Sequence, residues 1–352
     1  MRPIHLLAWV WVGVACDSGG SGTTARQATA DAQVTDAAAP PPDAAAPPLD
    51  AAPLDAAPLD AALPDMAVDL GPPPTLAECF AAVGGGLGPD YTPFNPVLGH
   101  HCKGTNHQTI EGVEKVVFLG DSVTYGTPPT LIPNQYRSLV TAGLKDRFGP
   151  DIEVSSCARL GARTDDFLSE DGEIPRCFPE GGSAKRTLVI FTMGGNDIAA
   201  WASDAETPER ALELADEAAD ALEATIAWLK DPARFPNGVD VIFANPYEFT
   251  DATGDLDACE LARVAGFSGN WIEGAGAVIH FNERYMQTAV AHQVDMIFTL
   301  EAFCGHGFHN EDPTGQCYQG PGTERWFDLT CIHPNDLGHR VIADMFLAVV
   351  DE

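Results

Sequence analysis

Short apolar segments alternate with longer helix-like patterns from residue 116 onward, and this alternation limits the fold more than any other feature. The segments that are typical of strands are Val116–Leu119, Ile152–Ser155, Thr187–Thr192, Val239–Ala244 and Met296–Leu300. Strands that alternate with helices form a parallel sheet with helices on both faces. In an open sheet of this kind the functional residues follow the carboxyl ends of the strands. The sequence therefore predicts an α/β domain with its site at that edge.

Four longer helices are predicted between and after these strands. Asn134 is expected to cap a helix that ends at Phe148, and Pro208 opens the longest helix, since proline is tolerated at the first helical position. The apolar stripe of this longest helix consists of Leu212, Ala215, Ala219, Leu222, Ile226 and Leu229. Its spacing of three and four residues predicts one continuous buried face. Two further helices are expected at His280–Ala291 and from Asn335 onward.

The N-terminus has the pattern of an export signal. A single positive charge at Arg2 precedes an apolar run, Ile4–Val14, which is too short to span a bilayer but suits a signal peptide over residues 1–15. The residues Gly-Val-Ala-Cys at 13–16 resemble a bacterial lipobox, which predicts lipidation of Cys16. Gly13 replaces the bulky aliphatic residue usual in a lipobox, so an ordinary cleaved signal is the alternative. Both interpretations export the protein, as a cell-envelope lipoprotein or a secreted one.

Residues 16–75 form a low-complexity segment of Ala, Pro and Asp that precedes a globular region, 76–352. Such a composition cannot bury enough apolar surface to fold, and its proline content favours an extended spacer. We therefore expect a disordered tether that joins the domain to a membrane anchor. The whole chain has 51 acidic and 19 basic residues, a formal net charge of −32, which excludes nucleic acid as a partner.

The cysteine content also fits an exported protein. There are nine cysteines, so setting Cys16 aside leaves an even number that can form four disulfides. Proximity in the sequence predicts the pairs Cys79–Cys102, Cys157–Cys177 and Cys304–Cys317. The first of these pairs suggests a disulfide-pinned flap ahead of the first strand.

Two possible metal sites were considered and neither is favoured. Cys304, His306 and His309 lack the paired CxxC spacing of a zinc site. Three aspartates in a second segment have the ligand type that Ca²⁺ prefers, but they fit no EF-hand spacing. These are Asp251, Asp255 and Asp257. A solvated acidic turn is the preferred interpretation of this segment, and no metal or other cofactor is expected.

Three polar positions lie where the site is expected. Ser122 follows the first strand, Asn196 follows the third strand within "GGND", and His333 precedes the last helix. A hydroxyl nucleophile needs a base within hydrogen-bond reach and donors for the developing oxyanion. A serine, a histidine and an asparagine at one sheet edge can supply all three. The segment around Ser122 lacks the second glycine of a G-x-S-x-G nucleophile elbow.

The motifs "GDSVTYG", "LGART", "GGND" and "IHPN" resemble, in this order, the four sequence blocks of the SGNH or GDSL hydrolase family. The resemblance implies an esterase or lipase with a three-layer α/β/α, flavodoxin-like fold around a parallel sheet of about five strands. It makes Ser122 the nucleophile and His333 the base. The oxyanion would be held by the backbone N–H groups of Ser122 and Gly161 and by the side-chain amide of Asn196.

One position departs from the family pattern. The family usually has an aspartate three residues before the catalytic histidine, and this chain has Thr330 there. Asp328, five residues before His333, is one candidate for orienting the imidazole. The backbone carbonyl of Thr330 is the other, and the sequence leaves both open.

These observations together predict an exported serine esterase that needs no cofactor. Its substrate would be a small-molecule, lipid or glycan ester, and the absence of a long apolar lid segment favours short acyl groups. The alternatives are an O-acyltransferase and a non-catalytic surface protein that binds glycan or a partner on the same fold.

Overall fold

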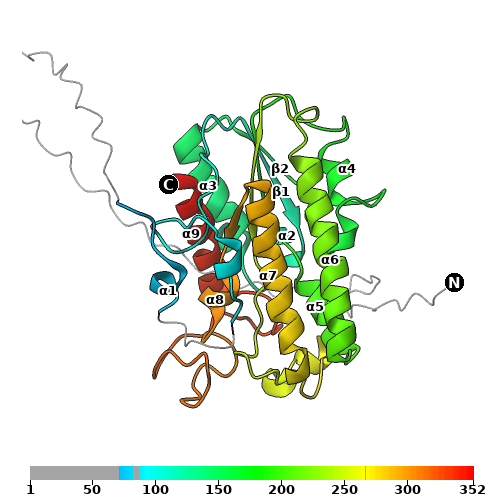
Figure 1. Cartoon of the computed structure of the whole chain (residues 1–352), viewed down its shortest axis with the longest axis vertical. Coiled ribbons are helices and arrows are strands. Elements are labelled where there is room, and N and C mark those ends of the chain that lie inside the picture. The colour runs from blue at the N-terminus through cyan, green and yellow to red at the C-terminus, as the bar shows by residue number, and fades with distance from the viewer. Residues whose placement is uncertain (1–70, 82–87, 266) are drawn as a thin grey trace, which may run out of the picture. The chain divides into compact units, whose positions relative to one another are not determined.

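The computed structural model describes residues 71–81, 88–265 and 267–352 (Figure 1). The predicted signal peptide, the lipidation of Cys16 and nearly all of the predicted tether lie outside these residues. The described part contains one sheet of five parallel strands in the order β2-β1-β3-β4-β5. The strands are β1 (Lys115–Gly120), β2 (Glu153–Ser156), β3 (Thr187–Thr192), β4 (Val239–Ala244) and β5 (Asp295–Ile297).

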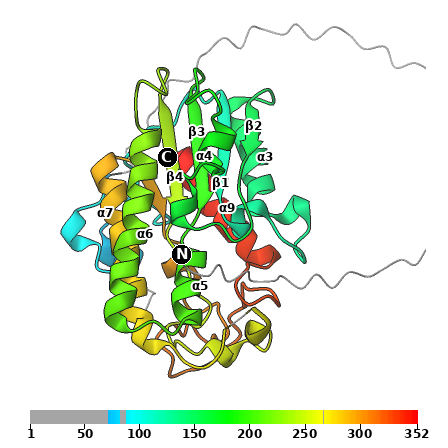
Figure 2. The same ribbon diagram turned by 90° about the vertical axis from the view of Figure 1, so that its right-hand side faces the viewer.

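Helices cover both faces of this sheet. Helices α3 (Tyr136–Phe148) and α9 (Asp336–Asp351) pack together on one face, and α6 (Pro208–Leu229) and α7 (Ala275–His292) pack together on the other. Figure 2 shows the three layers with the sheet between the two pairs of helices. The strand order is that of flavodoxin-like folds, in which the chain reverses its winding between β1 and β3. The predicted three-layer α/β/α fold is confirmed.

The remaining helical elements are short and lie mostly in the loops. They are α1 (Leu76–Cys79), α2 (Ser122–Tyr125), α4 (Glu173–Cys177), α5 (Gly195–Ser203), α8 (Thr299–Phe303) and six 3₁₀ turns. None of the helices within the described residues is both long enough and apolar enough to cross a membrane.

The predicted strands agree with the observed ones except at the last. β3 and β4 have the predicted bounds, and β1 and β2 differ by one residue at one or both ends. The prediction of a strand to Leu300 is wrong, because β5 ends at Ile297 and α8 begins at Thr299. The side-chain oxygen of Asn245 accepts hydrogen bonds from the Thr299 hydroxyl (3.1 Å) and the Leu300 N–H (3.0 Å). These bonds turn the chain out of the sheet.

The helix predictions hold with local corrections. Pro208 opens α6 as predicted, with Thr207 as its cap, and the last helix starts where predicted, with Asn335 as its cap. Leu212 was expected on the buried face of α6, but it is 40% exposed near the first turn. The cap of α3 is Gln135, because Asn134 belongs to a preceding 3₁₀ turn, where its amide donates to Asp336. Helix α7 begins five residues earlier than predicted.

The segment before β1 covers the open edge of the sheet. An antiparallel bridge joins Gly104 to Ile297, and the Thr105 N–H donates to the Met296 carbonyl at 3.0 Å. The buried carboxylate of Asp295 accepts a hydrogen bond from the Thr105 hydroxyl at 2.9 Å. An edge strand with unpaired backbone groups invites association with other chains. This segment protects β5 from such pairing.

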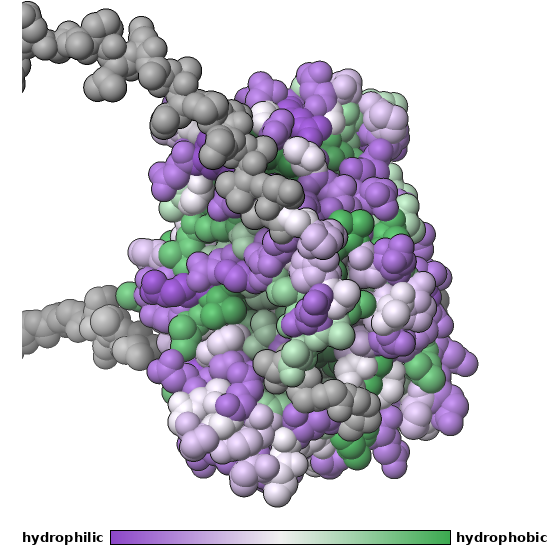
Figure 3. Space-filling view, turned by 60° about the vertical axis from the view of Figure 1, so that its left-hand side comes forward, coloured by the Kyte–Doolittle hydropathy of each residue, from purple (hydrophilic) through white to green (hydrophobic). Residues whose placement is uncertain are grey.

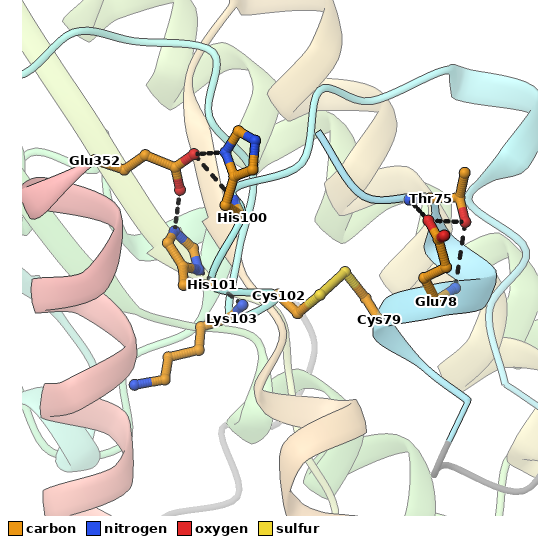
Figure 4. Close-up of a disulfide and its surroundings, with 8 residues drawn as sticks. All are labelled: Thr75, Glu78, Cys79, His100, His101, Cys102, Lys103 and Glu352. Carbon is orange, nitrogen blue, oxygen red and sulfur yellow. Dashed lines mark hydrogen bonds and ion pairs between the residues drawn. A yellow bond between two sulfur atoms is a disulfide. The ribbon is translucent and has the colours of Figure 1, made fainter. Parts of the chain in front are cut away.

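Figure 4 shows how the same segment is fixed at its other end. The Cys79–Cys102 disulfide joins it to α1, whose first turn is closed by reciprocal hydrogen bonds between Thr75 and Glu78. Beside the disulfide, the carboxylate of Glu352 accepts from the backbone N–H of His100 and contacts the imidazole of His100 at 2.7 Å. The end of α9 is thereby attached to the predicted flap.

All eight cysteines of the described residues form disulfides. The three predicted pairs, Cys79–Cys102, Cys157–Cys177 and Cys304–Cys317, are confirmed, and the fourth pair is Cys259–Cys331. On the face drawn in Figure 3, hydrophobic residues occur in small groups between hydrophilic ones. Four disulfides in one domain are typical of proteins that fold in an oxidising compartment.

Candidate active site

Ser122 lies at the point where β1 turns into α2. Asp121 is the N-cap of this short helix and Ser122 is its first residue, so the Ser122 N–H has no acceptor within the helix. Gly120 has φ +114°, and a Cβ at this position would lie 2.2 Å from the carbonyl oxygen of Thr192 on β3. The close approach of β1 and β3 therefore requires glycine. It places Ser122 at the carboxyl edge of the sheet, where the winding reverses.

Asp121 holds this turn in place. Its Oδ1 accepts hydrogen bonds from the Val123 N–H at 3.0 Å and the Thr192 hydroxyl at 2.8 Å. Burial raises the pKa of the Asp121 carboxyl to about 6. Sequence reasoning assigned no role to Asp121, although its place directly before a candidate nucleophile is a recognisable N-cap signal.

His333 faces Ser122 from the loop before α9. Its Nε2 lies 2.8 Å from the Ser122 Oγ, and both side chains are more than nine-tenths buried. Burial lowers the pKa of His333 to about 4, because the charged imidazolium loses its hydration. The imidazole is therefore neutral at pH 7 and can accept a proton from the serine. The structure brings together the predicted nucleophile and base.

The other imidazole nitrogen has a partner that neither sequence alternative anticipated. The Nδ1 of His333 lies 2.8 Å from the hydroxyl oxygen of Thr330, and that hydroxyl donates to Asp328 Oδ1 at 2.6 Å. The Thr330 N–H donates to the same carboxylate oxygen at 2.7 Å. The Asp328 carboxylate points into its own turn, because an aspartate side chain readily accepts a hydrogen bond from the backbone N–H two residues later. It reaches the imidazole only through the Thr330 side chain, and no backbone carbonyl of Thr330 is used.

Asn196 is held beside the serine by the turn after β3. Gly194 adopts φ +102°, and a Cβ there would lie 2.5 Å from the Tyr285 hydroxyl, so this turn also requires glycine. The Asn196 amide donates one hydrogen to the carbonyl oxygen of Ala162 at 2.8 Å. A side-chain amide has two N–H donors. The second N–H is available for an oxyanion.

The loop with Gly161 is docked onto the start of α5. The buried carboxylate of Asp197 accepts from the Thr164 N–H at 3.2 Å and from its hydroxyl at 3.1 Å. Burial raises the pKa of Asp197 to about 7. Gly161 itself is exposed, and it is not one of the residues that line the cavity beside Ser122. Of the predicted oxyanion residues, the structure brings Ser122 and Asn196 to the cavity, whereas Gly161 is not part of its lining.

A cavity of about 210 Å³ opens beside these groups, and Ser122, Asn196 and His333 all line it. Its walls come from α5, from the start of α7 and from the loops after β4 and α8. Most of the lining is apolar, including Ile198, Ala202, Phe249, Phe267, Trp271 and Val278. The Cys304–Cys317 disulfide forms part of one wall.

The two segments considered for metal binding have structural roles. Asp251 is buried, and its carboxylate accepts the backbone N–H groups of Gly305, Gly307 and His309, each at 2.9 Å. The preferred prediction of a solvated acidic turn is therefore wrong for Asp251. The Cys304 sulfur is bonded to Cys317 and is no thiolate ligand. Over the part of the chain that the structure describes, no three His, Cys, Asp or Glu side chains form a metal-binding group.

A buried serine–histidine pair at the switch point of a flavodoxin-like sheet is an arrangement typical of a hydrolase. The sequence model of the GDSL-like lipase/acylhydrolase family matches residues 118–341, well over half of the chain. The chain belongs to this family and is a hydrolase of ester bonds, as the sequence motifs predict. No curated protein matched the sequence.

Solved structures similar to this chain have low sequence identity to it. BT4096, a gut microbial diltiazem-metabolizing enzyme, is 15% identical with a TM-score of 0.47 over 70% of this chain, which spans about half (49%) of that protein. The acetyl xylan esterase AlAXEase is 20% identical, with a TM-score of 0.44 over 67% of this chain and 99% of its own. An extracellular lipase from Streptomyces rimosus is 17% identical, with a TM-score of 0.45 over 67% and 100%. That the chain belongs to the family rests on the match to the family's sequence model and not on these structures.

Proposed function

We propose that the protein is a serine esterase that acts through an acyl-enzyme. Ser122 Oγ attacks the ester carbonyl while His333 Nε2 takes its proton and passes it to the leaving alcohol. The Ser122 and Gly161 N–H groups and the Asn196 amide would hold the oxyanion. Water, deprotonated by His333, then releases the acid and restores the serine. The observation that carries this proposal is the 2.8 Å contact between buried His333 Nε2 and Ser122 Oγ.

The proposal includes export and a membrane anchor through Cys16. Pairing of all eight cysteines in the described residues supports an oxidising compartment. A lipidated Cys16 and a tether over residues 16–75 would hold the domain above the membrane, where it meets esters outside the cytoplasm. These could be small-molecule, lipid or glycan esters.

The cavity supports a short or ring-sized neutral acyl group. A cavity of 150 Å³ is large enough to bind benzene, so about 210 Å³ has room for a butyryl or benzoyl group. Among the described residues, those that line it include no Lys or Arg, whereas Asp121, Glu248 and Glu301 are present. An anionic acyl group would find no counter-charge there. We place the leaving oxygen beside His333 and the acyl group beside Asn196 and α5, both of which line the cavity.

Filling the cavity should change the acyl preference. We expect Val278→Trp to lower kcat/KM for p-nitrophenyl butyrate and benzoate roughly tenfold or more, because one methylene-sized change already shifts discrimination by that amount. Turnover of the acetate should change far less. Leu212→Trp, at an exposed position of α6, is the matched control and should leave kcat/KM for both substrates unchanged. An equal loss for acetate and benzoate in Val278→Trp would contradict this placement of the acyl group.

The pH profile should reflect the low pKa of His333. Since its folded-state pKa is about 4, the neutral base persists as the pH falls and is lost only near pH 4. We expect kcat/KM, which reports the free enzyme, to have an acid limb with a midpoint well below the ordinary histidine value of 6.5. The ionisable groups around His333 include Asp121 and Tyr247 in the cavity lining, Asp328 behind Thr330, and His339 on α9. Circular dichroism at each pH would show whether the protein stays folded, and a midpoint at 6.5 or above in folded protein would contradict the prediction.

The proposal is tested by ester hydrolysis and by active-site labelling of the purified protein. Release of p-nitrophenol from the acetate ester, together with covalent labelling by a fluorophosphonate, is the expected result. Release of acyl product only when a sugar acceptor is present would indicate the acyltransferase instead. Folded, disulfide-bonded protein that shows neither turnover nor labelling would overturn the esterase and leave the binding protein.

A further inference from the structure

Two turns in this chain have the same sequence pattern and the same hydrogen bonds, and only one of them adjoins a catalytic group. In the turn at Asp312–Thr314, Asp312 Oδ1 accepts from the Thr314 N–H (2.9 Å) and hydroxyl (2.7 Å). In the turn at Asp328–Thr330, Asp328 Oδ1 accepts from the Thr330 N–H (2.7 Å) and hydroxyl (2.6 Å). The local pattern therefore forms without an imidazole bonded to the threonine hydroxyl. What distinguishes the second turn is the Thr330 hydroxyl oxygen at 2.8 Å from His333 Nδ1.

The direction of these hydrogen bonds decides where the imidazole proton sits. An ionised carboxylate has no proton to give, so Asp328 can only accept. The Thr330 hydroxyl must then direct its hydrogen to Asp328 and present a lone pair to His333. His333 can donate a hydrogen bond to that lone pair only when Nδ1 carries the imidazole proton. This tautomer leaves Nε2 unprotonated and able to accept the proton of Ser122.

We propose that Thr330 is a positioning residue whose hydroxyl links the Asp328 carboxylate to His333 and fixes the Nδ1–H tautomer of the imidazole. This inference rests on the proposed esterase function. The order of donation is Ser122 to His333, His333 to Thr330 and Thr330 to Asp328, and no proton leaves Thr330 at any step. Asp328 is buried, and its other carboxylate oxygen has no hydrogen-bond partner among the described residues, so Thr330 links this carboxylate to the imidazole. A separate bond between the two residues joins backbone groups, the Asp328 N–H and the His333 carbonyl, at 2.9 Å.

The rival explanation is that this turn only shapes the loop before α9. The two explanations differ for substitutions that keep or remove the hydroxyl. Thr330→Val preserves the volume and the backbone N–H bond but removes the acceptor of the Nδ1 proton. Thr330→Ser keeps that acceptor with a smaller side chain. Thr314→Val makes the same chemical change in the exposed turn, away from the cavity lining.

Steady-state kinetics on these variants of the full protein form the first measurement. We expect Thr330→Val to lower kcat/KM for p-nitrophenyl acetate roughly 10- to 100-fold, because a buried donor is left without a partner. Thr330→Ser should remain within about threefold of wild type, and Thr314→Val should be unchanged. Adding Asp328→Asn to Thr330→Val should cause little further loss, because coupled residues are not additive. The relay would be overturned if Thr330→Val were as active as wild type, or if Thr330→Ser lost as much activity as Thr330→Val.

A second measurement does not depend on turnover. ¹⁵N NMR of the imidazoles at neutral pH, with His333 assigned from the spectrum of His333→Gln, reports which nitrogen carries the proton. The relay predicts Nδ1–H in the wild type and in Thr330→Ser, and loss of that single tautomer in Thr330→Val. Nε2–H in the wild type, or an unchanged tautomer in Thr330→Val, would refute it. If the protein hydrolysed no ester, the proposed function would fail while this spectrum still tested the relay.

Discussion

Ser122→Ala should abolish fluorophosphonate labelling and lower kcat for p-nitrophenyl acetate by about 10⁴- to 10⁶-fold, the loss seen when a serine nucleophile is removed. Alanine keeps the backbone N–H at the first position of α2 and removes only the Oγ that lies 2.8 Å from His333 Nε2. The side chain that remains has no atom able to form an ester with the acyl group. Residual turnover would come from binding and from the oxyanion donors.

The fold should tolerate this substitution. Asp121 and Gly120 hold the turn by contacts to β3 that do not use the serine hydroxyl. The melting temperature of Ser122→Ala should therefore stay close to that of wild type, and Ser138→Ala on α3 is a matched control for activity. Proteolytic digestion of labelled wild-type protein should give one modified peptide, the one that contains Ser122. A modified peptide from another serine would reject Ser122 as the nucleophile.

The sequence was most informative where segments are buried on both sides. β3 and β4 have the bounds that their largely apolar sequences predict, because every residue of both strands is buried, Asp240 included. The error at β5 arose from a contact distant in sequence, the hydrogen bonds that Thr299 and Leu300 donate to Asn245 at the start of α8. Leu212 is 40% exposed although it belongs to the apolar stripe of α6, since a stripe indicates a face but not how much of that face is covered.

The candidate site was predictable in its residue types and only partly in its contacts. Ser122 and Asn196 follow β1 and β3, so strand order brings them to one edge of the sheet, and His333 reaches the same edge from the loop before α9. The partner of His333 Nδ1 could not be derived from spacing. Asp328 at five residues and Thr330 at three were treated as competing partners, whereas the turn places one behind the other. A side chain that both accepts and donates can lie between two groups, and a motif does not show that.

His333→Ala should lower kcat for p-nitrophenyl acetate by a factor comparable to that for Ser122→Ala, about 10⁴-fold or more. Without the imidazole, no other side chain among the described residues bonds the Ser122 hydroxyl, so none there can take its proton or return it to the leaving alcohol. Because the pair acts as a unit, the double variant Ser122→Ala/His333→Ala should be little worse than either single variant. The acid limb of the pH profile should also disappear from the residual activity, since the titrating base is gone.

Chemical rescue separates the loss of a base from damage to the loop. The alanine variant leaves a gap beside Ser122 that free imidazole can enter, so added imidazole should restore part of the turnover of His333→Ala and none of that of Ser122→Ala. The matched control is His292→Ala, which should keep wild-type activity. His292 is half-buried at the C-terminal end of α7, where it contacts Glu223 of α6. Turnover of His333→Ala near the wild-type level would show that another group acts as the base. That result would also remove the reason for Thr330 to orient His333.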